Sequence, residues 1–275
     1  MLSNIALYGA IETGLIYGLV AFGIYLSFRV LDFPDLTVDG SFPLGAAVAA
    51  VLIIEGWNPW LATGCAVMAG MAAGAVTALL NVKLNILNLL ASILTMIALY
   101  SVNLRIMGRP NVALLTEETV LTPWYDLDLA YHQVPVLLFI IVVFVALILL
   151  WRFMKSETGL AMRATGANAR MARAQGIATG AMIVLGVALS NVLVGLAGSQ
   201  FDQSQGDADV PLVVGVIVLD LASLVGGDAV LSTSTVERHM SASVIGAIIY
   251  CIAHAFALED NVPEKIGKSL YNSTS

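Results

Sequence analysis

Charged residues are scarce in this chain of 275 residues. Asp, Glu, Lys and Arg together make up only 11% of it, whereas 59% of the residues are hydrophobic. An ordinary soluble domain carries about a quarter charged residues. So little charge cannot coat a water-soluble globule, which excludes an ordinary soluble domain. We therefore expect the chain to lie in a lipid bilayer and to bind no nucleic acid.

Cysteine and histidine are also rare. Cys65 and Cys251 lie in apolar stretches, where we expect unpaired thiols that behave as small hydrophobic groups. Cys251 and His254 have a ligand-like spacing, but the sequence places no third ligand near them. We predict no metal site and no cofactor, and we find no catalytic arrangement of Ser, His and Asp or of Cys and His.

A nucleotide-binding motif is lacking as well. Gly267, Lys268 and Ser269 resemble the end of a phosphate-binding loop, but Val262 stands where such a loop needs its first glycine. The chain is therefore predicted to be no enzyme and to contain no ATPase of its own.

Long uncharged windows are what the sequence has instead. They cover residues 13–28, 56–82, 84–104, 134–150, 174–201 and 239–258. Several reach the roughly 20 residues that a helix needs to span a bilayer. Two shorter apolar stretches are 40–54 and 210–227. We predict an all-α polytopic bundle of about seven to eight segments, including short or re-entrant ones, with a membrane domain at 1–258 and a polar tail at 259–275.

Charge asymmetry predicts how the chain threads the membrane. The loop 152–173 carries five basic residues and one acid, so the positive-inside rule places it in the cytoplasm. The acidic segment 110–133 contains no Lys or Arg and should face the other compartment. Counting spans back from the basic loop puts the N-terminus outside and leaves Arg105 and Arg109 as exceptions at the outer end of a span.

Small residues favour close helix packing in the window 56–82. Gly70 and Gly74 form a GxxxG pair, and Gly64 lies on the same stretch. Such residues let two helix backbones approach within a membrane. The alternative is that they only fill a lipid-facing helix.

The segment FPDLTVDGSFPLG at 33–45 leads acidic residues into an apolar stretch. Irregular backbone at membrane depth is tolerated only when it is buried in protein or lines a cavity, and Pro34 and Pro43 disfavour one straight helix. We expect Asp35 and Asp39 near the cytoplasmic mouth of a translocation path. The alternative is a solvated loop in which Asp39 or Ser41 caps the next helix.

Three further polar residues complete the predicted path. Asp220 interrupts an apolar stretch, and an ionisable residue inside the membrane suggests function unless the stretch is re-entrant or a boundary element. Thr95 and Asn103, in the window 84–104, are included with it.

The segment ETGLAMRATGANARMARAQGI at 157–177 is too polar for lipid and too short for a domain. We expect Gly159 and Gly166 to form turns before a compact Ala- and Arg-containing helix that ends at Gly176. A cytoplasmic partner should bind this helix. The alternative is an ordinary basic connector.

Three motifs resemble one family in order and content. They are FPDLTVDGSFPLGAAVAA, ILTMIALYSVNLRIMGRPNVALL and GLAMRATGANARMARAQGI, and the resemblance covers roughly residues 5–257. The chain resembles permease subunits of ABC importers of the branched-chain amino-acid type. In that family, a motif like the third forms a helix that docks into the ATPase subunit.

The resemblance implies a coupling segment at 157–176. Its predicted residues are Glu157, Gly159, Leu160, Arg163, Ala164, Gly166, Arg170, Met171 and Gly176. The implied partners are a cytoplasmic ATPase, an extracytoplasmic substrate-binding protein and a second permease, identical or different. The implied function is import of amino acids or related small solutes across the cell (inner) membrane by alternating access. A membrane scaffold or assembly protein and a passive channel remain the alternatives.

The sequence departs from the family at two places. The polar stretch 259–275 stands where the family continues with a final hydrophobic span, so a truncated or altered C-terminal end is expected. Asp220 stands where the family has a neutral residue, and Asp228 stands near the position of an expected Glu.

Overall fold

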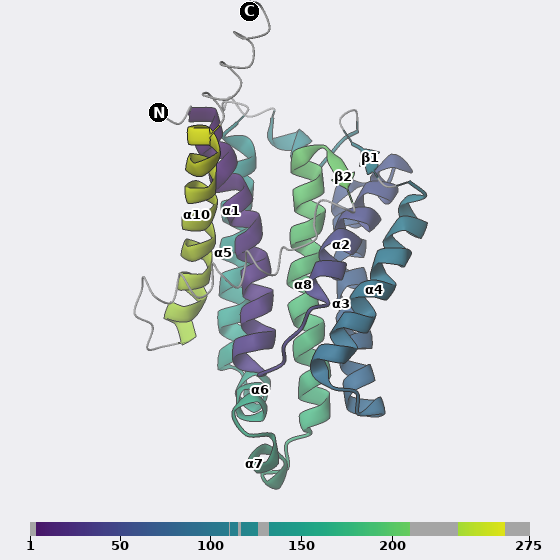
Figure 1. The fold of residues 1–275 in the computed structure, drawn as a ribbon. Coiled ribbons are helices and arrows are strands. Elements are labelled where there is room, and N and C mark those ends of the chain that lie inside the picture. The colour runs from purple at the N-terminus through teal and green to yellow at the C-terminus, as the bar shows by residue number, and fades with distance from the viewer. Residues whose placement is uncertain (1–3, 110, 115–116, 126–131, 210–235, 262–275) are drawn as a thin grey trace, which may run out of the picture.

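The computed structural model describes residues 4–109, 111–114, 117–125, 132–209 and 236–261, which form a helical bundle (Figure 1). Five helical stretches in this part of the chain are long and apolar enough to cross a bilayer. They are α1 (Asn4–Ile24) with its continuation to Val30, α3 (Pro59–Leu84), α4 (Asn88–Met107), α5 (Val134–Lys155) and α8 (Thr179–Gln205). Two further helices with apolar stretches are α2 (Val38–Ile54) and α10 (Val236–Asn261).

The predicted all-α polytopic fold is therefore confirmed. The stretch 210–227 with Asp220 lies outside the described residues, as does the tail from 262 onward, which includes Gly267, Lys268 and Ser269. Helix α10 continues to Asn261, so the first three residues of the predicted polar tail are helical.

Helix α8 occupies the centre of the bundle. In Figure 1 it lies between a group made of α1, α5 and α10 and a group made of α2, α3 and α4. It packs on α3, α2 and α1. Helix α8 thereby joins the two groups.

The predicted GxxxG pair lies in the contact between α3 and α8. A Cβ added at Gly70 would collide with the carbonyl oxygen of Asn191, and one added at Gly74 would lie 2.5 Å from that of Val187. Gly64 differs, since nothing lies within 4 Å of its added Cβ. The prediction of close packing is confirmed at Gly70 and Gly74, because only the missing side chains let the two backbones come this near.

The first span ends in an irregular break. Helix α1 passes into a π-helical stretch, η1 (Tyr25–Val30), and the chain then runs without helix to the start of α2 at Val38. In Figure 1 this connection rises into the bundle before α2 begins. The expected irregularity around Pro34 is confirmed, whereas Pro43 lies inside α2.

The alternative in which Asp39 or Ser41 of a solvated loop caps α2 is wrong. Thr37 occupies the capping position and makes no side-chain cap. Its hydroxyl instead lies 2.8 Å from the hydroxyl of Thr77 on α3, and its backbone N–H donates to Asp35. Thr37 therefore links the start of α2 to α3.

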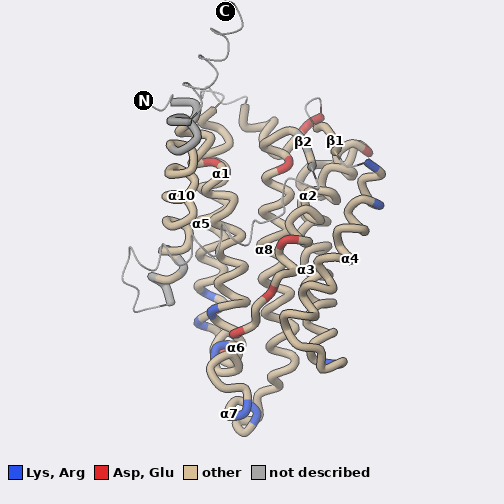
Figure 2. The backbone as a smooth tube through the Cα atoms, in the orientation of Figure 1, with Lys and Arg blue, Asp and Glu red and all other residues tan. Residues whose placement is uncertain are grey.

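Opposite ends of the bundle carry different structures. At one end lie two short helices, α6 (Glu157–Ala167) and α7 (Ala169–Ala174), and Figure 2 shows basic residues gathered around them. At the other end, β1 (Asn111–Ala113) pairs antiparallel with β2 (Asp207–Asp209), close to the short 3-10 helix η2 (Thr122–Trp124). The start of α1 lies at this second end (Figure 1).

Candidate functional site

Capping residues shape the α6–α7 segment. The Ser156 hydroxyl accepts a hydrogen bond from the Gly159 N–H at 3.2 Å at the start of α6. The Asn168 side chain accepts from the N–H groups of Arg170 and Met171 at 3.1 and 3.0 Å at the start of α7. Gly176 follows with a φ of +83°, which ends the segment in a conformation that favours glycine. The segment is thus two ordered helices with defined ends.

One face of α6 is pressed against the bundle. Met162 is fully buried, and its side chain lies beside Gly186 of α8. An added Cβ at Gly159 would collide with the Phe153 carbonyl oxygen of α5, and one at Gly166 would collide with the Val30 carbonyl oxygen of η1. Helix α6 therefore touches three membrane segments, namely α5, η1 and α8.

The expectation that Gly159 and Gly166 form turns before a helix is wrong. Both residues lie inside α6. They lack a side chain because backbone from α5 and η1 passes directly beneath them. Both lie on the face of α6 that packs against the bundle.

The opposite face of α6 and α7 is open. Leu160 is 54% exposed and Met171 is 63% exposed, although both are large hydrophobic residues. Their neighbours Glu157, Arg163, Ala164 and Arg170 are exposed as well. We name Leu160, Arg163, Ala164, Arg170 and Met171 the outer surface of α6–α7. Apolar side chains rimmed by charged ones, at the polar end of a bundle, are typical of a protein-binding surface.

A second group of predicted residues lies inside the bundle. Asp35 is fully buried and receives hydrogen bonds from the Thr37 N–H at 2.9 Å and from the Asn191 amide of α8 at 2.8 Å. The Ser41 hydroxyl of α2 donates to the Asn191 side-chain oxygen at 2.6 Å. With the contact between Thr37 and Thr77, these residues form a polar seam where α2, α3 and α8 meet.

Helix α4 also contacts the first turn of α2. The Asn103 amide donates to the Gly40 carbonyl oxygen at 3.2 Å, next to the half-buried Asp39. The Asn103 side-chain oxygen is buried and makes no hydrogen bond with the described residues. Thr95 is also buried, but its hydroxyl donates to Ala91 of its own helix at 3.0 Å.

The structure thus gathers part of the predicted path around the start of α2. Asp35, Asp39 and Asn103 lie on or beside that segment, and Asp220 lies outside the described residues. The sequence analysis missed Asn191 and Thr77. A polar amide in the uncharged window 174–201 was the signal for Asn191, by the same reasoning that drew attention to Asp220.

Comparison with known proteins decides the family. Residues 6–259 match the family described as "Branched-chain amino acid transport system / permease component". The chain belongs to this permease family. The resemblance found in the sequence is therefore confirmed. The permease is a multi-pass membrane protein that serves in transport rather than as an enzyme.

Three known proteins are similar in sequence to the permease. The permease is 36% identical over 244 residues to a tyrosine transport system permease protein of Clostridioides difficile (strain R20291), covering 89% of this chain and 80% of the relative. It is 35% identical over 256 residues to an uncharacterized protein of Rickettsia prowazekii (strain Madrid E), covering 90% and 88%.

The third relative is a galactofuranose transporter permease protein of Escherichia coli (strain K12). The identity is 26% over 222 residues, covering 78% of this chain and 61% of the relative. No solved structure matches the permease.

Proposed function

We propose that this permease is the membrane subunit of an ATP-driven importer whose separate cytoplasmic ATPase binds the outer surface of α6–α7. The observation that carries the proposal is the exposure of Leu160 and Met171 on capped helices at the basic end of the bundle. Exposed ion pairs contribute only about 0 to 1 kcal/mol each, so docking of these apolar side chains should dominate the binding.

The contacts of α6 supply a route from the ATPase into the membrane. Gly166 rests on the end of η1, and Met162 rests on α8 beside Leu31. A displacement of α6 would move η1 and α8 together, and both adjoin the polar seam at Asp35. Alternating access requires the ATPase to bias a two-state bundle by only a few kcal/mol.

The relatives' names support the class of substrate. One relative is named for tyrosine transport, and the family is named for branched-chain amino acids. We therefore propose an amino acid or a related small solute as substrate, delivered by an extracytoplasmic binding protein to a pair of permease subunits. In this arrangement the α6–α7 end is cytoplasmic and the start of α1 is outside.

Substitutions on the outer surface test the proposal. Met171→Asp and Leu160→Asp should abolish co-purification of the ATPase and ATP-driven uptake in reconstituted vesicles. Thermal unfolding of the permease should not change, because both side chains are exposed. Met171→Leu is the matched control and should keep uptake, since it preserves an apolar contact of similar volume.

The same assay separates the alternatives. Normal ATP-driven uptake by both Asp variants would contradict the proposal and leave α6–α7 as a connector. A passive channel would carry solute down its gradient without the ATPase. A scaffold protein would carry none under any condition.

A further inference from the structure

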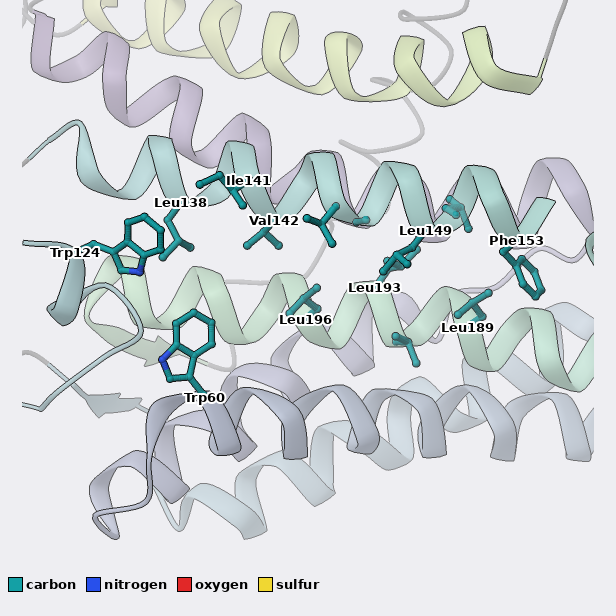
Figure 3. A pocket seen from close by; sticks show the side chains of 14 residues that line it. Trp60, Trp124, Leu138, Ile141, Val142, Leu149, Phe153, Leu189, Leu193 and Leu196 are labelled. Atoms are coloured by element: carbon teal, nitrogen blue, oxygen red, sulfur yellow. The ribbon is translucent and has the colours of Figure 1, made fainter. Parts of the chain in front are cut away.

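An apolar groove runs along one side of the bundle between α3, α5 and α8. One half has a volume of about 510 Å³, with Trp60 and Trp124 at its far end. Figure 3 shows these two rings at one end of the groove and Phe153 at the other, with the side chains of α5 and α8 facing one another between them.

The groove continues beyond Phe153. A second cavity of about 630 Å³ shares Phe153, Leu189 and Val192 with the first and reaches Lys83, in the last turn of α3. The two cavities therefore adjoin at these three residues, and the groove follows α8 from Gly180 to Leu196. Its walls are aliphatic and aromatic except at Lys83.

Beside Val82 and Gly180 the groove adjoins a polar pocket. This third cavity, of about 390 Å³, shares Val82 and Gly180 with the second and is lined by Arg173 of α7 and by asparagines of the α3–α4 turn. None of the described residues that line the three cavities is Asp or Glu. One basic residue therefore lies on each side of this junction, Lys83 in the second cavity and Arg173 in the third, and no described Asp or Glu lines either cavity.

We propose that this groove binds an anionic glycerophospholipid, with an acyl chain between α5 and α8 and its phosphate between Lys83 and Arg173. The charge of the pocket is complementary to a phosphate group, and the apolar walls match a hydrocarbon chain. Basic pockets between membrane helices at the cytoplasmic side are a recurrent site for anionic head groups. Lysine at a helix end reaches the interface while its methylene groups stay on apolar surface.

The proposal does not depend on ATP-driven transport. Lipid binding is measured on the permease alone, so its failure would leave the proposed function untouched. The site nevertheless adjoins α7, so a bound lipid would lie beside the surface proposed for the ATPase.

Native mass spectrometry of the full chain in mild detergent tests the head-group site. Phosphatidylglycerol and phosphatidylcholine with identical acyl chains are the two probes. We expect retention of phosphatidylglycerol to exceed that of phosphatidylcholine, and to fall about fivefold in Lys83→Gln or Arg173→Gln and about thirtyfold in the double variant. Arg152→Gln removes a positive charge at the same end outside the cavities and should leave retention unchanged.

Filling the groove tests the acyl-chain site. Ala188 lines the second cavity, so Ala188→Trp should reduce retention of phosphatidylglycerol while the thermal unfolding midpoint and the oligomeric state stay the same. Equal retention of both lipids, or no response to the double variant, would overturn the proposal. If Ala188→Trp instead dissociated an oligomer and left phosphatidylglycerol bound, the groove would be the contact with a second copy, and the proposal would be wrong.

Discussion

A carboxylate buried between helices is costly unless hydrogen-bond donors compensate it. Thr37 and Asn191 supply donors to Asp35, among them the backbone N–H of Thr37 and the amide of Asn191. Asn191 is the more demanding partner because it comes from a different helix and is itself oriented by Ser41. The side chain of Asn191 therefore links the start of α2 to α8.

Replacing Asn191 should lower the stability of the bundle. Asn191→Leu leaves the Asp35 carboxylate without a donor from α8, and we expect the free energy of unfolding to fall by about 1–3 kcal/mol. The measurement is the loss of helical circular dichroism during titration with a denaturing detergent. Adding Asp35→Asn to Asn191→Leu should recover part of the loss, because a neutral group is less costly to bury. Equal and additive losses in the double variant would show that the two side chains do not interact.

The contrast between Gly74 and Gly64 gives a second test at the scale of single residues. At Gly74 an added Cβ would lie 2.8 Å from the Asn191 amide nitrogen, whereas nothing lies within 4 Å at Gly64. Gly74→Leu should therefore destabilise the bundle by about 1–3 kcal/mol through overpacking. Gly64→Leu, on the same helix, should leave the unfolding transition nearly unchanged. Similar transitions for the two variants would mean that α3 and α8 are not packed as described.

At the scale of elements, α6 shows what the sequence pattern could and could not predict. Its polarity and basic charge correctly separated it from the membrane spans. The pattern did not show whether Gly159 and Gly166 served a turn or a close approach, because glycine permits both. The backbone of Phe153 and of Val30, which belong to α5 and η1, shows that both glycines serve a close approach and not a turn.

The start of α2 illustrates a different limit. Pro34 predicted a break in the helix, and the break is present. The hydrogen bond between Asp35 and Asn191 joins residues 156 positions apart, and no local pattern contains that information. The π-helical stretch η1 likewise depends on how the end of α1 packs on α6 and α8.

Gly166 tests whether α6 transmits movement to η1. Gly166→Ala should displace α6 from Val30 while leaving the outer surface intact. We expect the ATPase still to co-purify and uptake to fall about tenfold, which corresponds to a loss of about 1.4 kcal/mol in the bias between two states. The exposed neighbour Ala167 provides the control, since Ala167→Ser should keep uptake. Normal uptake by Gly166→Ala would contradict a route through η1.

At the scale of the whole molecule, the two ends of the bundle differ in charge and in structure. Basic residues surround α6 and α7, whereas the other end carries the paired strands, acidic residues and two arginines near the end of α4 (Figure 2). Charge counts in the sequence placed these segments at opposite ends. The sidedness of each end is a separate prediction.

Cysteine labelling in intact cells tests that sidedness. Ala174 and Glu118 are both exposed and lie near opposite ends of the bundle. In a background of Cys65→Ala and Cys251→Ala, a membrane-impermeant maleimide should label Glu118→Cys but not Ala174→Cys until the cells are opened. Labelling of Ala174→Cys alone in intact cells would reverse the orientation.

The central place of α8 also sets an order for biogenesis. Helix α8 begins at Thr179, so α1, α2 and α3 leave the ribosome long before the helix that they share as a packing partner. Until then the glycine face of α3 and the carboxylate of Asp35 have no cover from α8. A nascent chain arrested before Thr179 should therefore be held by membrane chaperones or degraded by quality-control proteases, whereas a chain arrested after Gln205 should already resist them.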